Sequence, residues 1–350
     1  MPDGLWVVAL TGMPEVRAGD DLAALVAEGV RALGLTIDEG DVFVVSSKVA
    51  SKALGLVAPD RESAVAAATV RVVAERAMAD GRVTRVVESA SGPVMAAAGV
   101  DASNTGASDS VLLLPTDPDG VCASLLAALQ RDFDVTRLGV VLSDTSGRPW
   151  REGQVDFALG AAGLSVVDDL RGTVDADGRA LAVTARAVAD EVAAAADLVK
   201  GKVERVPVAL VRGLGAFVTG LVGAGARSLV RTGPDDWFAT GSAEAVRAAL
   251  GVAPGSERSE RVGIAAMGEE TVTVRVGRAV AVALSDEALD ESVGVDVGPD
   301  AVVVTGGDPV DRGIVAARLG VALWGEGFGS SLERAANRGS DSVTVRIWER

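Results

Sequence analysis

Residues 40–55, "GDVFVVSSKVASKALG", contain the pattern that decides the fold. The apolar, β-branched run predicts a strand over 41–47, which ends at Ser46 and Ser47. Two lysines, Lys48 and Lys52, follow the strand directly. A helix starting here would add its first free backbone N–H groups to the serine hydroxyls and the ammonium groups. The stretch therefore predicts a strand end that can bind an anion.

Similar strands alternate with alanine-rich helical patterns through the first part of the chain. We expect further strands at 5–12, 110–115, 138–144 and 206–213. Apolar residues recur at helical spacing from Leu22 to Val30 behind Asp20 and Asp21, and "AVADEVAAAADLVK" predicts a helix that stops near Gly201. The alternation predicts a mixed α/β, or α+β, fold.

The polar stretch "GVAPGSERSERVG", residues 251–263, reads as a boundary between two domains. We expect one domain over 1–250 and a small C-terminal α/β domain over 256–350. In the latter, "TVTVRVGRAVAVALS", "DAVVVTGG" and "SVTVRIWER" predict strands, and "DPVDRGIVAARLGVAL" predicts a helix with Pro309 in its first turn.

The composition excludes several classes of chemistry. The chain of 350 residues has a net charge of −16 and lacks histidine and tyrosine. A Ser-His-Asp triad and histidine metal ligands are therefore impossible, and a nucleic-acid backbone is an unfavourable partner. No signal-like N-terminus or apolar run of about 18 residues occurs, so we expect a cytoplasmic protein without membrane contact.

Lysine is concentrated at two places, Lys48 with Lys52 and Lys200 with Lys202, while the other 29 basic residues are arginines. A compact ammonium suits phosphate oxygens whose geometry changes during a reaction, whereas the planar guanidinium suits fixed bidentate contacts. The pattern favours phosphate binding, and solvated lysines at strand ends are the alternative.

Two acidic segments could hold a divalent cation. "LSDTSGRPWREGQVD" places Asp144 and Thr145 at a strand end before Arg148 and Arg151, and "GVDASNTG" supplies Asp101 with Asn104 nearby. Hard cations prefer carboxylate, hydroxyl and phosphate oxygens. The alternative is that both aspartates are ordinary turn residues, because Asp is common in loops.

Six segments, in order along the chain, resemble the coenzyme F420-0:L-glutamate ligase family (F420 γ-glutamyl ligases). They are "GDVFVVSSKVASKALG", "AAAGVDASNTG", "SDTSGRPWREGQVDFALGAAGL", "DLRGTVDADGRAL", "AVADEVAAAADLVKGK" and "PVALVRGLG". The resemblance implies an intertwined α+β fold that forms homodimers. It also implies a ligase that joins L-glutamate to coenzyme F420-0, and then further γ-linked glutamates, through an acyl phosphate with release of GDP and phosphate.

The resemblance also assigns roles to residues. It implies GTP contacts at Met13, Pro14, Glu15, Val16, Ser47, Lys52, Asn104, Gly201 and Lys202. It implies metal ligands at Asp101, Asp144 and Thr145, which would bind a pair of Mg²⁺ or Mn²⁺ ions, with K⁺ as a further cation. Lys52, Arg148 and Arg151 are the expected catalytic residues, because positive charge must neutralise the triphosphate.

Two other functions stay open at this point. One is a catalytically silent partner that binds nucleotide or F420, and the other is a metal-dependent ligase with a different carboxylate acceptor. In two-domain relatives a long nitroreductase-like FMN domain follows the ligase, but only about 95 residues follow here. FMN binding is therefore not carried over.

Overall fold

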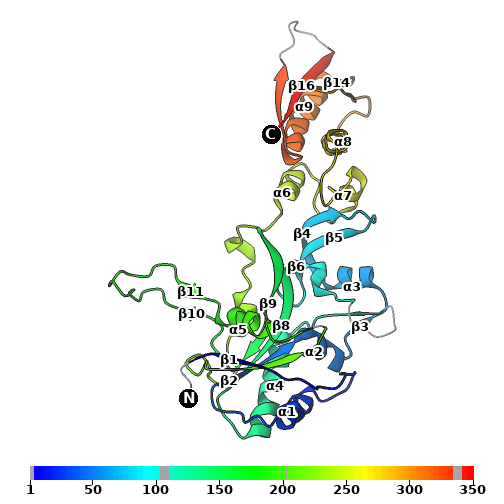
Figure 1. The fold of residues 1–350 in the computed structure, drawn as a ribbon. Coiled ribbons are helices and arrows are strands. Elements are labelled where there is room, and N and C mark those ends of the chain that lie inside the picture. Colours follow the sequence, from blue (N-terminus) through cyan, green and yellow to red (C-terminus); the bar gives the residue numbers. More distant parts are fainter. Residues whose placement is uncertain (1–3, 103–109, 202, 334–340) are drawn as a thin grey trace. The chain divides into compact units, whose positions relative to one another are not determined.

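The protein is described here by a computed structural model, in which residues 4–102, 110–201, 203–333 and 341–350 are described. The chain divides into two compact units (Figure 1). Unit 1 comprises Met1–Val70 and Glu88–Asp235, and unit 2 comprises Arg71–Val87 and Asp236–Arg350. The sequence-predicted boundary at 250–256 lies inside unit 2, where the polar stretch folds into a helix that Ser256 caps.

The helices and strands of unit 1 are, in chain order, β1 (Trp6–Ala9), α1 (Leu22–Ala32), β2 (Asp41–Ser46), α2 (Ser47–Ala53), β3 (Val57–Ala58), α3 (Arg61–Ala68), β6 (Val94–Ala96), η1 (Ala97–Gly99), β7 (Val111–Leu112), α4 (Pro118–Phe133), β8 (Leu138–Arg148), β9 (Arg151–Ala162), β10 (Asp168–Asp169), β11 (Ala185–Arg186), α5 (Val188–Asp197), β12 (Val208–Arg212), η2 (Ala226–Leu229) and η3 (Gly233–Asp235). Unit 2 contains most of β4 (Thr69–Ala77) and β5 (Val83–Ser89), then α6 (Ser242–Ala249), α7 (Glu257–Val262), α8 (Val272–Ala283), β13 (Gly294–Val297), β14 (Ala301–Thr305), α9 (Pro309–Gly325), β15 (Phe328–Glu333) and β16 (Ser342–Glu349). The predicted mixed α/β class is confirmed.

A five-stranded sheet in the order β1-β12-β2-β8-β9 forms the centre of unit 1. Its middle pair, β2 and β8, is parallel, and the other pairs are antiparallel. The strands expected at 5–12, 41–47, 138–144 and 206–213 all belong to this sheet. The parallel pair matters for function, because parallel strands end at the same edge of a sheet.

Both faces of the sheet are covered by helices. Phe43 and Val45 point to the side of α1 and α4, whereas Val42 and Val44 point to the side of α5. Since successive side chains of a strand face opposite sides, a strand buried on both faces needs an unbroken apolar run. This explains the sequence of β2. The first turn of α1 is capped by Asp21, which accepts from the N–H of Ala24 as predicted.

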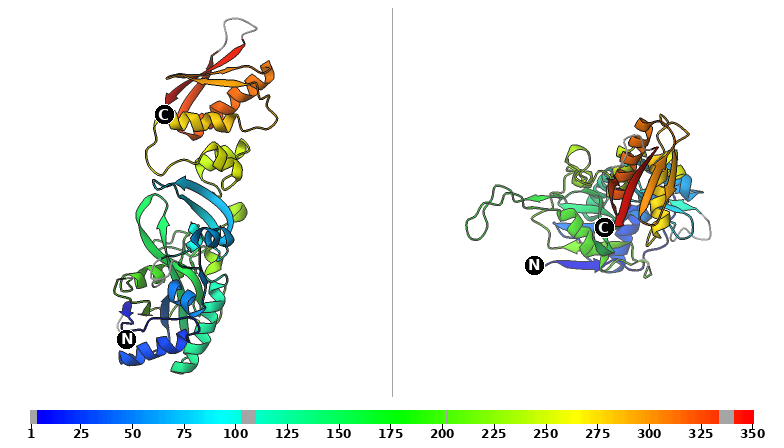
Figure 2. Two further views of the ribbon diagram at one scale, coloured as in Figure 1. Left: turned by 90° about the vertical axis from the view of Figure 1, so that its right-hand side faces the viewer. Right: turned by 90° about the horizontal axis from the view of Figure 1, so that it is seen from above.

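Unit 2 contains a four-stranded antiparallel sheet in the order β13-β14-β16-β15. Helices α8 and α9 pack on this sheet around a shared apolar core (Figure 2). The strands predicted from "DAVVVTGG" and "SVTVRIWER" and the helix starting at Pro309 are confirmed.

One prediction for the C-terminal region is wrong. "TVTVRVGRAVAVALS" was expected to form strand, but residues Val272–Ala283 form helix α8. Its buried residues include Val276, Ala279 and Ala283, which recur every three to four residues and so lie on one helical face. The β-branched composition favoured a strand, and packing on α9 overrides that preference.

Candidate functional site

The first turn of α2 lies beside the middle of β8, where the pairing of β8 with β2 ends. The sequence predicts a strand end at Asp144 and Thr145, but β8 continues to Arg148 in its pairing with β9. The parallel register of β2 and β8 ends with Ser46 opposite Ser143. The next residues along the chain are Ser47, which begins α2, and Asp144 of β8. The carboxyl ends of parallel strands are where ligands usually bind in open α/β sheets. This edge therefore collects the polar residues predicted from two distant segments.

Asp144 is half-buried and held by Ser47. The hydroxyl Oγ of Ser47 donates to Oδ1 of Asp144 at 2.9 Å. Burial raises the pKa of Asp144 to about 6, and the nearby charges of Asp156 and Asp101 act in the same direction, while the hydrogen bond from Ser47 opposes them. The site thus holds a carboxylate that lacks sufficient positive charge around it.

Asp101 reaches the same helix terminus. Its Oδ2 lies 2.5 Å from Nζ of Lys48, the residue after Ser47. The first two residues of α2 therefore each hold one of the two predicted metal-binding aspartates. The structure brings these two segments together, which their distance in the sequence left open.

Thr145 contacts the neighbouring strand rather than α2. Its Oγ1 donates to Oδ1 of Asp156 at 2.7 Å, and Oδ2 of Asp156 accepts from Oγ of Ser143 at 2.8 Å and from Nζ of Lys200 at 2.6 Å. Thr145 and Asp156 lie directly opposite each other in the β8–β9 pairing. A compact polar cluster therefore adjoins the two aspartates.

A cavity of about 570 Å³ opens next to this cluster. Seven of the residues predicted for the site line it: Met13, Pro14, Glu15, Val16, Lys52, Thr145 and Gly201. Ser47 and Asp144 do not line it, but their neighbours Ser46, Lys48 and Thr145 do. The volume lies within the range of pockets that enclose small molecules.

The lysines of this cavity are paired with carboxylates. Lys52 contacts Glu15, and this contact lowers the pKa of Glu15, with the charge of Arg205 acting in the same direction. Lys48 pairs with Asp101 and Lys200 with Asp156. The three lysines that the structure describes thus converge on one cavity, with charge that an anionic ligand could use.

Comparison with known proteins identifies the kind of protein. A family model described as F420-0:Gamma-glutamyl ligase matches residues 12–213. The chain is 43% identical over 228 residues to the coenzyme F420:L-glutamate ligase of Halobacterium salinarum, with 58% of this chain and 85% of the relative covered. It is 37% identical over 229 residues to the enzyme of that name from Methanothermobacter thermautotrophicus, with 60% and 89% covered.

The chain belongs to the F420-0:gamma-glutamyl ligase family. The matched region contains the cavity, both aspartates and the described lysines. The family model ends before the second segment of unit 2, Asp236–Arg350.

The donor atoms of this site fit the divalent cations that the family resemblance implies. Within the described ranges no three His, Cys, Asp or Glu residues converge as a complete metal cage. Mg²⁺ usually binds through one or two carboxylates together with water and substrate phosphates, so a full protein cage is not required. Asp101, Asp144 and the hydroxyl of Thr145 supply such a partial set beside the cavity.

Arg148 and Arg151 lie elsewhere, around the turn between β8 and β9. Both are exposed, and Nη2 of Arg148 donates to the carbonyl oxygen of Glu152 at 2.7 Å. Neither lines the cavity. Two further residues predicted to contact GTP, Asn104 and Lys202, lie outside the described residues.

Several residues that line the cavity do not stand out in the sequence as site residues. Asp156, Asp197 and Arg205 line it, as do Lys48 and Lys200, which the lysine pattern had singled out without a specific role. Arg205 adopts a left-handed backbone with φ of +56°, which is uncommon for a residue other than glycine. Their positions in the sequence are the one feature that could indicate a role. Asp156 is the last residue of the segment "GRPWREGQVD", and Arg205 follows the second lysine pair.

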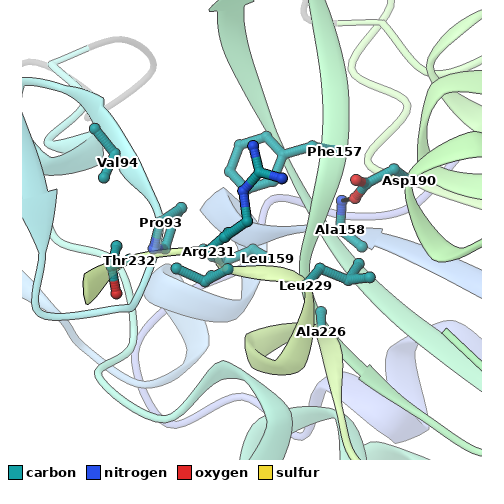
Figure 3. Close-up of a pocket in the computed structure, with 11 residues that line it drawn as sticks. Pro93, Val94, Phe157, Ala158, Leu159, Asp190, Ala226, Leu229, Arg231 and Thr232 are labelled. Carbon is teal, nitrogen blue, oxygen red and sulfur yellow. Dashed lines mark hydrogen bonds between the residues drawn. The ribbon is translucent and has the colours of Figure 1, made fainter. Parts of the chain in front are cut away.

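A smaller cavity of about 180 Å³ lies beside β9 (Figure 3). Asp190 lies in its wall, and Oδ1 of Asp190 accepts from the N–H of Ala158 at 2.9 Å. This N–H is next to an irregularity in the β8–β9 pairing, and burial raises the pKa of Asp190. The carboxylate thus stabilises the edge strand, and the rest of the wall is largely apolar.

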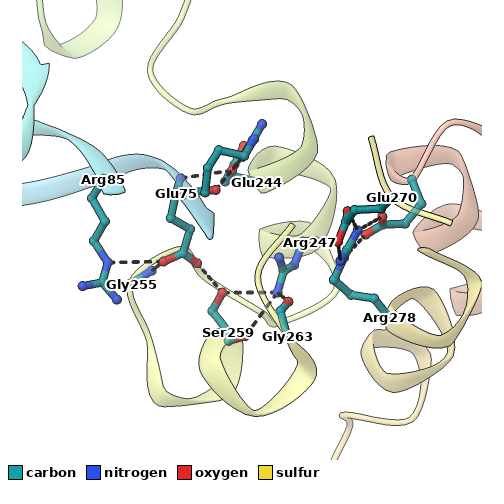
Figure 4. A network of polar contacts seen from close by, with 11 residues as sticks. Glu75, Arg85, Glu244, Arg247, Gly255, Ser259, Gly263, Glu270 and Arg278 are labelled. Carbon is teal, nitrogen blue, oxygen red and sulfur yellow. Dashed lines mark hydrogen bonds and ion pairs between the residues drawn. The ribbon is translucent and has the colours of Figure 1, made fainter. Parts of the chain in front are cut away.

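Unit 2 contains a buried polar network of its own (Figure 4). Glu75 accepts from the N–H of Gly255 at 3.1 Å and from the hydroxyl of Ser259, and Arg85 lies next to it. In a neighbouring cluster Arg278 pairs with both Glu270 and Glu326. Opposite charges meet within each cluster, which is typical of a network that supports the fold.

In the described part of the chain no helix has the length and apolar composition needed to cross a membrane.

Proposed function

We propose that this chain is a GTP-dependent ligase that joins L-glutamate to coenzyme F420-0 and then adds further γ-linked glutamates. The observation that carries the proposal is that Thr145 and three lysines line one cavity. Asp101 and Asp144 are held beside it by Lys48 and Ser47, the first two residues of α2. The family membership and the names of the relatives supply the acceptor and the amino acid.

The reaction needs an activation step, because a free carboxylate does not acylate an amine. A carboxylate oxygen of F420-0 attacks the γ-phosphorus of GTP, the bond between that phosphorus and the bridging oxygen breaks, and GDP leaves. The amine of glutamate then attacks the acyl carbon of the acyl phosphate. The carbon–oxygen bond to phosphate breaks, the amine loses a proton, and phosphate leaves.

The residues of this chain bind and orient the triphosphate. Lys48 and Lys52 are paired with Asp101 and Glu15, and both lysines line the cavity. When GTP binds, their ammonium groups leave these carboxylates and donate to phosphate oxygens instead. Such hydrogen bonds are strong because both the donor and the acceptor are charged. Bound divalent cations would supply further charge neutralisation, and Asp101, Asp144 and Thr145 would hold them. Positioning and charge are the main requirements of phosphoryl transfer, so a chain without histidine can catalyse it.

We further propose that the enzyme works as a homodimer with Mg²⁺ or Mn²⁺, as the family resemblance implies. Its exposed arginines Arg148 and Arg151 stay in the proposed catalytic set.

The direct test is an assay of the full chain with GTP, Mg²⁺, F420-0 and L-glutamate. We expect GDP release together with a product whose mass has increased by one or more glutamyl groups. The Asp144→Asn variant should fold normally and form no product. GTP binding without GDP release would instead support a silent binding partner, and turnover only with other carboxylates would support a different acceptor.

A further inference from the structure

Asp156 uses both of its carboxylate oxygens inside the protein. Oδ1 accepts from Oγ1 of Thr145 at 2.7 Å, and Oδ2 accepts from Ser143 at 2.8 Å and from Nζ of Lys200 at 2.6 Å. The side chains of Asp156 and Lys200 are each only 5% exposed. A carboxylate occupied in this way is poorly placed to bind a ligand itself, so its effect must pass through the groups that it holds.

Of the two hydroxyl-bearing residues that donate to Asp156, Thr145 lines the cavity and Ser143 does not. A hydroxyl has one hydrogen and two lone pairs, and Thr145 donates its hydrogen to Asp156. Its remaining capacity is therefore that of an acceptor. An oxygen presenting only lone pairs suits a cation and does not suit the hydrogen-bond acceptors of a phosphate group.

Lys200 fixes the other end of this arrangement. Its ammonium also contacts Oγ of Ser143 at 2.5 Å, so Lys200 and Ser143 together hold Oδ2 of Asp156. Lys200 lies between α5 and the bridge that pairs Gly201 with Val206. The burial of both charges makes their separation costly, which keeps the Asp156 carboxylate in one orientation.

We propose that Asp156 and Lys200 form a positioning pair that presents the Thr145 oxygen, as an acceptor only, to the divalent cation of the proposed reaction. This inference rests on the proposed function. It assigns no direct ligand role to either member of the pair. Partners that orient metal ligands typically affect metal affinity by about 10–100-fold when they are replaced.

The test measures Mn²⁺ binding to the full chain in the presence of GTP, by electron paramagnetic resonance of free Mn²⁺. Asp156→Asn and Lys200→Met should each raise the Kd for Mn²⁺ by about 10–100-fold. GTP affinity measured without metal should change far less. An unchanged Kd for Mn²⁺ in both variants would overturn the inference.

A matched control separates positioning from general damage to the sheet. Asp41 is also buried, and it pairs with Arg212 at the opposite end of β2, with Nη2 to Oδ2 at 2.7 Å. Asp41→Asn removes a comparable ion pair, so it should lower the melting temperature without changing the Kd for Mn²⁺. If the control weakens Mn²⁺ binding as much as Asp156→Asn does, the role of Asp156 is structural and the inference fails.

The link through Thr145 is tested by combining variants. Thr145→Val removes the hydroxyl, so adding Asp156→Asn to it should weaken Mn²⁺ binding no further, whereas independent effects would add.

Should Asp156→Asn fail to fold because Lys200 is left unpaired, the double variant Lys200→Met with Asp156→Asn restores neutrality and must show the same loss. Full Mn²⁺ affinity in that double variant would overturn the inference. Wild-type chain that binds no Mn²⁺ with GTP would refute the proposed function as well, whereas normal ligase activity with additive variants would refute the positioning pair alone.

Discussion

Ser47 and Asp144 are 97 residues apart in the sequence, and a hydrogen bond of 2.9 Å joins the Ser47 hydroxyl to the Asp144 carboxylate. The contact follows from the parallel pairing of β2 and β8, which ends one residue before each of them. Partial burial of Asp144 nevertheless raises its pKa from 3.8 to about 6. The cation that we propose for this site would stabilise the ionised form of Asp144, which partial burial disfavours.

The first prediction concerns stability and pH. Because folding raises the pKa of Asp144, the folded chain holds its proton more tightly than the unfolded chain, and this contribution to stability is lost as the pH rises from about 4 through about 6. The shift corresponds to about 3 kcal/mol. Without ligand at pH 7.5, Asp144→Asn should therefore be more stable than the wild type by up to about 2–3 kcal/mol.

Urea unfolding in EDTA at several pH values measures this difference. The two proteins should be similar near pH 4 and diverge through pH 6. Adding GTP with Mg²⁺ should then stabilise the wild type only, since a ligand stabilises the state that binds it. A stability difference that does not change with pH would show that Asp144 is not the titrating group.

The second prediction concerns Lys52. Its partner Glu15 is 59% exposed, and exposed ion pairs contribute little, so Lys52→Ala should cost less than about 1 kcal/mol of unfolding free energy. A hydrogen bond to a charged phosphate oxygen is worth about 1.5–3 kcal/mol, so GTP affinity should fall by about 10–100-fold. Calorimetric titration with GTP checks this.

Glu15→Gln is the matched control for Lys52. It breaks the same ion pair but leaves the ammonium free to bind phosphate, so GTP affinity should stay equal or increase. If Glu15→Gln loses GTP affinity while Lys52→Ala keeps it, Glu15 rather than Lys52 is needed for GTP binding, and the prediction is wrong.

Much of unit 1 could be predicted from local patterns. The unbroken apolar run of β2 and the Asp cap of α1 indicate their own structure, because burial on both faces and a free helix N–H each demand a residue type. Helix α8 could not be predicted in this way, since its valines suit strand locally and its helical state depends on packing against α9. The assignment of residues 71–87 to unit 2 likewise depends on distant contacts, such as that of Glu75 with Ser259.

In the site, too, some residues can be predicted from the sequence and others only from the folded structure. Asp101, Asp144 and the lysine pairs stand out by residue type and by the family resemblance. Asp156 stands out only once β8 and β9 are paired, because its importance comes from lying opposite Thr145. Lys200 similarly gains a specific partner only when α5 is placed against the sheet.

The third prediction concerns Arg148 and Arg151. Both are exposed and neither lines the cavity, so replacing either with alanine should leave the Kd for GTP nearly unchanged. If they stabilise charge during transfer, kcat should fall by about 100-fold, as for the loss of one oxyanion-stabilising donor. Steady-state kinetics combined with GTP titration separates the two quantities. Unchanged turnover would remove both arginines from the proposed catalytic set.

The fourth prediction concerns the stability of unit 2. The side chain of Glu75 has no exposed surface, and it holds Gly255, Ser259 and Arg85 together. Removing one partner from a buried charged network leaves the others uncompensated, so Glu75→Ala should cost about 3–5 kcal/mol. Glu260 also pairs with Arg85 but is 60% exposed, so Glu260→Ala should cost less than about 1 kcal/mol.

Calorimetry should show a transition that moves to lower temperature in Glu75→Ala only. GTP affinity at low temperature should be unaffected, because the cavity belongs to unit 1. Equal destabilisation by the two variants would show that the network is not what holds unit 2 together.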